Sequence, residues 1–311
     1  MDHSATPIRW RARQYTLPVR ERVLIMGVLN VTPDSFSDGG RYLSVEAAVA
    51  RAEQIEAEGA DLLDLGGESS RPGSQPVPLD VELARVLPVL TALAGRVRIP
   101  ISVDTTKAEV ARRALDAGAA IINDVSALRN DPDMADVVAK AQAGLILMHM
   151  QGIPATMQDH PAYAAVVEEV YDFLRSRLEA AVADGIEVER IAVDPGFGFG
   201  KTLDHNVALL GGLPALRGLD RPIVIGPSRK SFVGAMLRRP VEEREWGTAA
   251  AVAVGVFQGA HVVRVHSVRQ MKDVAGVAQS LRDQMPVNRY SLNVKREALE
   301  GDDRCISSLH D

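Results

Sequence analysis

Residues 100–126 read PISVDTTKAEVARRALDAGAAIINDVS, which is two apolar runs joined by a helical pattern. Each run is short and nearly continuous, as expected for a parallel strand that is covered on both faces. Between the runs, Thr106 and Glu109 have the spacing of a helix capping box, and Val110 and Ala114 belong to one apolar stripe. The segment therefore predicts one strand–helix–strand unit.

The same unit recurs along the chain. Eight apolar runs begin between residues 23 and 261, on average about 34 residues apart, which is the length of one strand plus one helix. They read VLIMGVLN from Val23, DLLDLGG from Asp61, PISVDT from Pro100, IINDVSA from Ile121, GLILMHM from Gly144, IAVDPG from Ile191, IVIGPS from Ile223 and HVVRVHS from His261. Eight such units predict an α/β fold of the TIM type, a closed (β/α)₈ barrel with eight parallel strands.

Polar residues stand at the ends of these runs, where a buried strand has no structural need for them. Because the carboxyl ends of the strands in such a barrel meet at one rim, we expect these side chains to share one mouth. They are Asn30, Asp104, Asn123, Asp194, Ser228, Arg264 and His266. This convergence indicates an enzyme.

Length and composition predict one main domain. The repeat favours a barrel over residues 22–284, a short N-terminal extension (a strand or hairpin) over 1–21 and a polar, disordered tail over 285–311. A net charge of −6 offers no basic footprint for nucleic acid. The chain has no apolar run typical of a membrane span or a secretory signal, and its single cysteine, Cys305, excludes an intrachain disulfide. We expect a cytoplasmic protein with neither nucleic-acid nor membrane partners.

The last two strands predict an anion site. Arg264 and His266 are two residues apart on one strand, so both side chains point to the same side. The seventh strand runs into Gly226-Pro-Ser-Arg-Lys-Ser231, whose amides, hydroxyls and lysine suit a phosphate. The alternative is that Arg264 pairs with a barrel carboxylate, Asp64 or Asp124, and that His266 caps the next helix.

A second group predicts recognition of a flat heterocycle. Asp104, Asn123 and Asp194 end three other strands, and carboxylates beside a carboxamide match an amino-pyrimidinone edge. The alternative is that all three only cap helices. In the run DPGFGFGKT from Asp194, we interpret the glycines as room for the flat ligand and Phe199 as a stacking wall.

The first strand predicts a metal ligand. Asn30 carries a hard carboxamide oxygen, and Mg²⁺ often takes only one or two protein oxygens together with substrate phosphates. Initiation of a turn into Val31 explains this asparagine equally well. Residues 31–43 and 68–79 are rich in Gly, Pro and Ser and follow strand ends, which is typical of binding loops or lids.

Taken together, these segments resemble the dihydropteroate synthase family, the folate-pathway transferases that sulfonamides target. The matching stretches follow the family's order within residues 22–284. They are NVTPDSFSDGG (30–40), GGESSRPG (66–73), SVDT (102–105), INDVS (122–126), LMHMQG (147–152), DPGFGFGK (194–201), SRKSF (228–232) and RVH (264–266). Ser70 stands where many members have threonine.

The resemblance implies that a dihydropterin bearing a CH₂-diphosphate condenses with 4-aminobenzoate in an SN1-like displacement assisted by Mg²⁺. It implies pterin contacts from Asp104, Asn123, Met148, Asp194, Phe199 and Lys230, and diphosphate contacts from Asn30, Arg264 and His266, with Mg²⁺ at Asn30. It implies aminobenzoate contacts from Phe36, Ser70, Arg71 and Ser231. The implied catalytic residues are Asp104, Asp194, Lys230, Arg264 and His266, and the implied assembly is a homodimer.

Two other functions remain open at this point. A pterin-dependent methyltransferase on a similar barrel would share the aspartate–asparagine edge but would not need the Ser-Arg-Lys-Ser anion site. A non-catalytic pterin-binding paralogue would be expected to lose its loop residues, whereas both loops are complete here. A sugar-phosphate barrel enzyme is disfavoured by the heterocycle edge.

Overall fold

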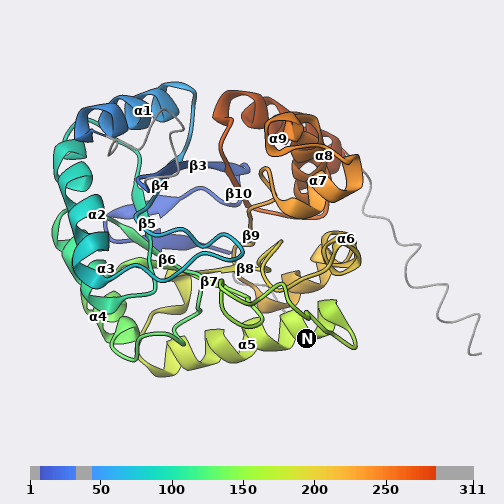
Figure 1. Ribbon diagram of the computed structural model, residues 1–311, viewed down its shortest axis with the longest axis horizontal. Helices are drawn as coiled ribbons and strands as arrows, with labels where there is room; N and C mark the ends of the chain where they lie inside the picture. The colour runs from blue at the N-terminus through green and yellow to red at the C-terminus, as the bar shows by residue number, and fades with distance from the viewer. Residues whose placement is uncertain (1–7, 33–43, 285–311) are drawn as a thin grey trace, which may run out of the picture.

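The structure, a computed structural model, describes residues 8–32 and 44–284, and within them eight parallel strands form a barrel (Figure 1). The strands are β3 (Leu24–Asn30), β4 (Leu62–Gly66), β5 (Ile101–Asp104), β6 (Ile121–Asp124), β7 (Gly144–Met148), β8 (Ile191–Asp194), β9 (Val224–Ile225) and β10 (Val262–Val265). The sheet order is β8-β7-β6-β5-β4-β3-β10-β9, and a parallel bridge between Val193 and Ile223 joins its two edges. The predicted (β/α)₈ barrel is confirmed.

Helices alternate with the strands and surround them (Figure 1). They are α1 (Val45–Ala57), α2 (Leu79–Leu93), α3 (Ala108–Asp116), α4 (Met134–Ala141), α5 (Val166–Ala183), α6 (Leu203–Gly211), α7 (Ser231–Leu237), α8 (Glu245–Phe257) and α9 (Val268–Gln284). Short 3₁₀ turns, η2 (Val188–Arg190), η3 (Leu213–Leu219) and η4 (Val241–Glu243), complete the connections. No helix in these described ranges is long and apolar enough to cross a membrane.

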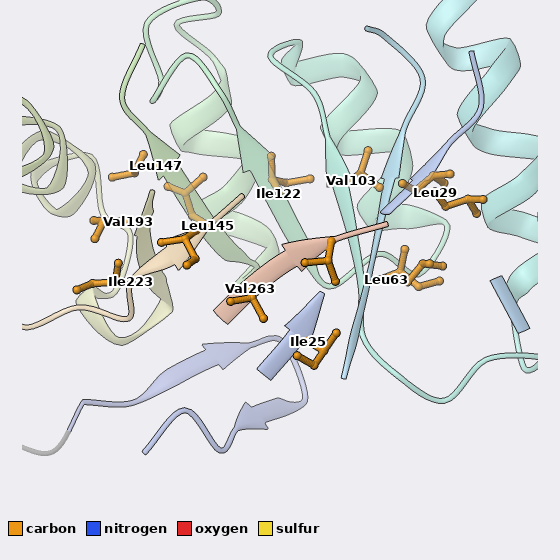
Figure 2. Close-up of a cluster of buried hydrophobic side chains, with 14 of the residues drawn as sticks. Ile25, Leu29, Leu63, Val103, Ile122, Leu145, Leu147, Val193, Ile223 and Val263 are labelled. Carbon is orange, nitrogen blue, oxygen red and sulfur yellow. The ribbon is translucent and has the colours of Figure 1, made fainter. Parts of the chain in front are cut away.

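Side-chain alternation along the strands divides the barrel into two faces. Leu62 packs inside the barrel, whereas Leu63 packs in the main apolar cluster under the helices, and the same change of face recurs on the other strands. Figure 2 shows members of the outer cluster, including Ile122, Val193 and Val263, from several strands. Because side chains alternate between the two faces of a strand, the position of a polar residue along its strand also decides whether it points into the barrel.

A hairpin of β1 (Trp10–Ala12) and β2 (Tyr15–Leu17) fills the amino-terminal end of the barrel. Trp10 is fully buried, and its indole Nε1 donates to the Arg190 carbonyl at 3.0 Å. Ala12 lies so close to Gly144 that a Cβ there would be 2.9 Å away. The described part of the predicted N-terminal extension is thus a hairpin plug, which leaves the opposite rim for ligands.

One local prediction at a helix start is wrong. Ser44 caps α1 as its hydroxyl accepts from the Ala47 N–H, but α3 does not begin with a Thr106 capping box. Its N-cap is Lys107, and the Ala108 N–H donates instead to Asp131 Oδ2 at 2.8 Å. A carboxylate from the next unit therefore replaces the local cap. The predicted tail from residue 285 and Phe36 lie outside the described residues, and the domain boundaries at 22 and 284 remain predictions.

We expect Trp10→Ala to lower the free energy of unfolding by about 3–5 kcal/mol, because it empties the plug and leaves the Arg190 carbonyl without its donor. Thr16→Ala, an exposed position on the same hairpin, should change it by less than about 0.5 kcal/mol. Urea denaturation followed by circular dichroism measures both. Equal effects of the two substitutions would contradict the plug.

Candidate active site

The inward-facing strand ends form one pocket at the carboxyl rim. All six residues that the resemblance assigns to a pterin line it, from β5, β6, β7, β8 and the loop after it, and the N-cap of α7. They are Asp104, Asn123, Met148, Asp194, Phe199 and Lys230, and Ser70, Gly226 and Arg264 complete much of the wall. Of the strand-end residues predicted to share one mouth, Asp104, Asn123, Asp194 and Arg264 line this pocket, whereas Asn30, Ser228 and His266 do not.

Arg264 links the two predicted groups directly. Its Nε donates to Asp64 Oδ2 at 2.6 Å, and its Nη2 donates to Asp104 Oδ2 at 3.1 Å. The alternative that Arg264 pairs with a barrel carboxylate thus holds for Asp64. Asp124 instead accepts from the Ser126 and Leu128 amides in the next turn. The pairing does not remove Arg264 from the site, because the same side chain lines the pocket.

Asp64 is a site residue that the sequence did not predict, except as one alternative partner of Arg264. It is fully buried on β4, and its Oδ2 also accepts from Asn123 Nδ2 at 3.3 Å. Its Oδ1 is buried without a hydrogen-bond partner among the described residues. The residue lies in the middle of an apolar run, so only strand alternation, which puts it two residues before Gly66 on the inner face, could have revealed it.

Burial brings the pocket's ionisable groups close to neutral pH. Desolvation raises the pKa of Asp104 to about 7 and that of Asp194 to about 6, although Arg264 and Lys230 oppose both shifts. Desolvation, then repulsion from Arg264, lowers the pKa of Lys230 to about 7. The Lys230 ammonium lies 3.8 Å from the centre of the Phe199 ring. A bound ligand with suitable donors would therefore decide which of these groups are charged.

Two of the glycines after β8 allow a close approach of the loop after β7. Gly196 has φ +68°, and a Cβ there would lie 1.9 Å from the His149 carbonyl oxygen. Gly200 has φ +60°, and its Cβ would lie 2.4 Å from the Gln151 carbonyl oxygen. At Gly196 and Gly200 the interpretation of the glycines as room for a flat ligand is wrong, because the backbone of the loop after β7 occupies the space that a Cβ would need. The Gly196 backbone nevertheless lines the pocket. Phe199, between them, does line the pocket.

The predicted anion-site residues also meet. His266 Nδ1 is 2.9 Å from Ser228 Oγ, and Lys230 is the N-cap of α7. Burial, then the positive charge of Arg264, lowers the pKa of His266 to about 3, so its imidazole is neutral at pH 7 in the free protein. His266 bonds this serine rather than capping α9. Ser231 is the exposed first residue of α7.

Asn30 ends β3 beside β4, and its Oδ1 would be 3.2 Å from a Cβ on Gly66. None of the described residues forms a hydrogen bond with its side chain. The described ranges also contain no cluster of three or more His, Cys, Asp or Glu that could hold a metal ion. These residues fit a Mg²⁺ ion bound by one protein oxygen together with ligand oxygens, not a metal site built by the protein alone.

Fold and pocket together define the class: a (β/α)₈ barrel enzyme whose mouth joins a carboxylate–carboxamide edge to a cluster of cationic and hydroxyl groups. Residues 26–266 match the model of a family described as "Pterin binding enzyme". The dihydropteroate synthase of Synechocystis sp. is 44% identical over 262 residues, which are 84% of this chain and 91% of that protein.

Two solved structures are similar over nearly their full lengths. The Yersinia pestis dihydropteroate synthase with a sulfonamide drug has a TM-score of 0.84 and 41% identity, covering 88% of this chain and 99% of that one. The Xanthomonas albilineans dihydropteroate synthase with 4-aminobenzoic acid has a TM-score of 0.83 and 45% identity, covering 90% and 100%. The chain belongs to the dihydropteroate synthase family of pterin-binding enzymes, which are transferases.

We expect Asp194→Asn to stabilise the free protein at pH 8 by on the order of 2 kcal/mol, since it removes a buried charge and keeps an acceptor for the Gly196 N–H. A carboxyl whose folded pKa of about 6 exceeds the unfolded value stabilises the fold at low pH and loses this contribution as pH rises through 6. The gain should therefore fade towards pH 4. Chemical denaturation across pH measures it, and a less stable variant at pH 8 would contradict the site's electrostatics.

Proposed function

We propose that this chain is a dihydropteroate synthase, which condenses (7,8-dihydropterin-6-yl)methyl diphosphate with 4-aminobenzoate to 7,8-dihydropteroate and diphosphate. The observation that carries the proposal is the single pocket in which Asp104, Asn123 and Asp194 lie with Arg264 and Lys230. It offers acceptors for an amino-pyrimidinone edge next to cations for a diphosphate. The family membership supports the same reaction.

In this proposal the pterin ring lies between Met148 and Phe199, and its amino-pyrimidinone edge meets the carboxylates and the carboxamide. Asn123 is already oriented by its donation to Asp64, so its carbonyl oxygen is free to accept from the ring. Ligand N–H groups favour the ionised carboxylates, which burial alone disfavours. Ring binding is thereby coupled to the charge of the pocket.

The diphosphate then points towards Arg264, His266 and the turn that carries Ser228 and Lys230. A bound Mg²⁺, held by Asn30 and ligand oxygens, would supply further positive charge to the leaving group. His266 is neutral in the free protein, and an adjacent diphosphate favours its protonated form. Substrate binding therefore increases the positive charge of the residues around the diphosphate.

Chemistry follows from electrostatics without a protein nucleophile. The methylene C–O bond breaks with its electron pair leaving on the diphosphate, and the positive charge spreads into the pterin ring. Asp104 and Asp194 favour that cationic ring, and Arg264 favours the departing anion. The amine lone pair of 4-aminobenzoate forms the C–N bond, and the surplus amine proton passes to solvent.

The aminobenzoate is assigned to the outer part of the mouth, with Ser70, Arg71, Ser231 and Phe36 as its contacts. Ser70 lines the pocket, and Arg71 is exposed on the same loop, where its guanidinium can meet a carboxylate. Arg71 is also near enough to lower the pKa of Lys230 and His266. A pterin-dependent methyltransferase would leave these cations and the Ser228–His266 pair without a ligand.

We also propose a cytoplasmic homodimer. About half of the exposed large apolar side chains among the described residues lie on α7, α8 and α9, which pack in sequence (Figure 1). Trp246 on α8 is 87% exposed, and Met236 and Val277 belong to the same group. Such a surface is typical of a protein–protein interface. Light scattering should give twice the 33.5 kDa of the chain, and a monomer at micromolar concentration would contradict the dimer.

The direct test of the function is an amine-dependent reaction. The protein is incubated with the pterin methyl diphosphate, Mg²⁺ and 4-aminobenzoate, and diphosphate and dihydropteroate are quantified. We expect equimolar products, no diphosphate without the amine, and a loss of activity with EDTA that Mg²⁺ restores. Diphosphate release without any amine dependence would contradict the proposal.

Because different residues bind the pterin ring and the diphosphate in this proposal, two substitutions should have different effects. His266→Ala should weaken binding of the pterin methyl diphosphate about tenfold and leave bare 6-hydroxymethylpterin nearly unchanged, because His266 bonds Ser228 and not the carboxylates. Arg264→Met should weaken both ligands, since Arg264 also holds Asp104. Calorimetry measures the four affinities. Equal losses for both ligands in His266→Ala would refute the split.

A further inference from the structure

A buried lysine lies behind the pocket, and nothing in the proposed reaction uses it. Lys201 is 3% exposed and does not line the pocket. Its ammonium has three partners, namely His149 Nδ1 at 2.9 Å and the Gly196 and Phe199 carbonyls at 2.9 and 3.0 Å. A buried cation with all its protons engaged fixes the groups around it.

The two carbonyls that Lys201 holds belong to residues that shape the pocket. The Gly196 N–H donates to Asp194 Oδ1 at 2.7 Å, so the peptide that Lys201 anchors also orients the carboxylate. Phe199 carries the ring under the Lys230 ammonium. Gln158 and Tyr163, from the loop after β7, hold the intervening Gly198 and Gly200 carbonyls. Lys201 is thus the charged member of a set of contacts that fixes the whole glycine loop.

We infer that Lys201 is a positioning residue for pterin recognition: from outside the pocket it fixes the glycine loop and favours the ionised form of Asp194. This inference rests on the proposed function, in which Asp194 binds the pterin as a carboxylate. The neutral imidazole of His149 accepts from the Lys201 ammonium through Nδ1 and so holds that ammonium in place. Lys201 itself touches no substrate.

The charges around Asp194 support the electrostatic half of the inference. Burial raises the pKa of Asp194 to about 6, against the hydrogen bond from the Gly196 N–H and the charges of Lys230, Arg264 and, last, Lys201, each of which lowers it. Asp64 on β4 and Asp104 on β5 face Arg264. His149, the residue after β7, has its pKa lowered to about 2 by burial and then by the charge of Lys201. Removing the Lys201 charge must therefore raise the pKa of Asp194 further.

The test is Lys201→Met in the full-length protein, with Lys140→Met as the matched control on the surface of α4. Calorimetry with 6-hydroxymethylpterin is run from pH 5.5 to 9. We expect Lys201→Met to weaken pterin binding about threefold at pH 6.5 and about eightfold at pH 5.5, which corresponds to a rise of about one unit in the pKa of Asp194 from its value of about 6. The Michaelis constant for 4-aminobenzoate should stay within twofold of the wild-type value, and Lys140→Met should match wild type in both measurements.

The pH profile separates this role from simple loosening of the loop. Binding requires ionised Asp194, so affinity falls as pH drops through its pKa, and Lys201→Met should move that acid limb about one pH unit upward. The difference should shrink above pH 8, because burial lowers the pKa of Lys201 to about 7 and the wild-type charge is itself lost there. A folded Lys201→Met variant with wild-type affinity and an unmoved acid limb would overturn the inference.

A second pair of variants decides the matter if Lys201→Met does not fold. His149→Asn keeps an acceptor near the Nδ1 position, whereas His149→Leu removes it. We expect pterin affinity to fall about fivefold in the leucine variant and by less than twofold in the asparagine variant; equal losses would overturn the inference. Asp194→Asn serves as the reference. If it leaves pterin affinity unchanged, the proposed pterin site fails, and the inference fails with it.

Discussion

The ion pair between Asp64 and Arg264 ties the site together. Asp64, fully buried on β4, accepts from Arg264 on β10 and from Asn123 on β6, while Arg264 extends to Asp104 on β5. One carboxylate inside the barrel thus orients the guanidinium and the carboxamide and, through Arg264, the rim carboxylate. Such a buried pair contributes little net stability, because desolvation offsets much of the attraction. The ion pair instead fixes the positions of the side chains that line the pocket.

Around this pair, the barrel maintains a pocket in which burial disfavours charge. Burial raises the pKa of Asp104 and Asp194 and lowers that of Lys230, so the free protein holds unlike charges in an environment that opposes all of them. A ligand with ring N–H groups at one end and an anion at the other satisfies them together. Preorganised groups of this kind stabilise a transition state because they need no reorganisation during the reaction. The hairpin plug with Trp10 closes the opposite end.

The sequence predicted the barrel and most of the rim because both depend on period and position. Asp104, Asn123 and Asp194 end apolar runs, and a strand end is a visible place in a sequence. Asp64 was harder, since it lies within a run and its role depends on a partner 200 residues away. The prediction of a Thr106 capping box for α3 was wrong because Asp131, in the next strand–helix unit, accepts from the Ala108 N–H instead. Gly196 and Gly200 were misinterpreted because the backbone that they accommodate, at His149 and Gln151, lies in the loop after β7, more than 40 residues earlier in the chain.

We propose that one pocket binds a pterin ring by its carboxylate side and a diphosphate by its cationic side. A crystal structure with the pterin methyl diphosphate bound tests it most directly. The amino-pyrimidinone edge should lie against Asp104, Asn123 and Asp194, and the diphosphate against Arg264 and His266. A ring bound away from these carboxylates, or a diphosphate on their side of the pocket, would contradict it.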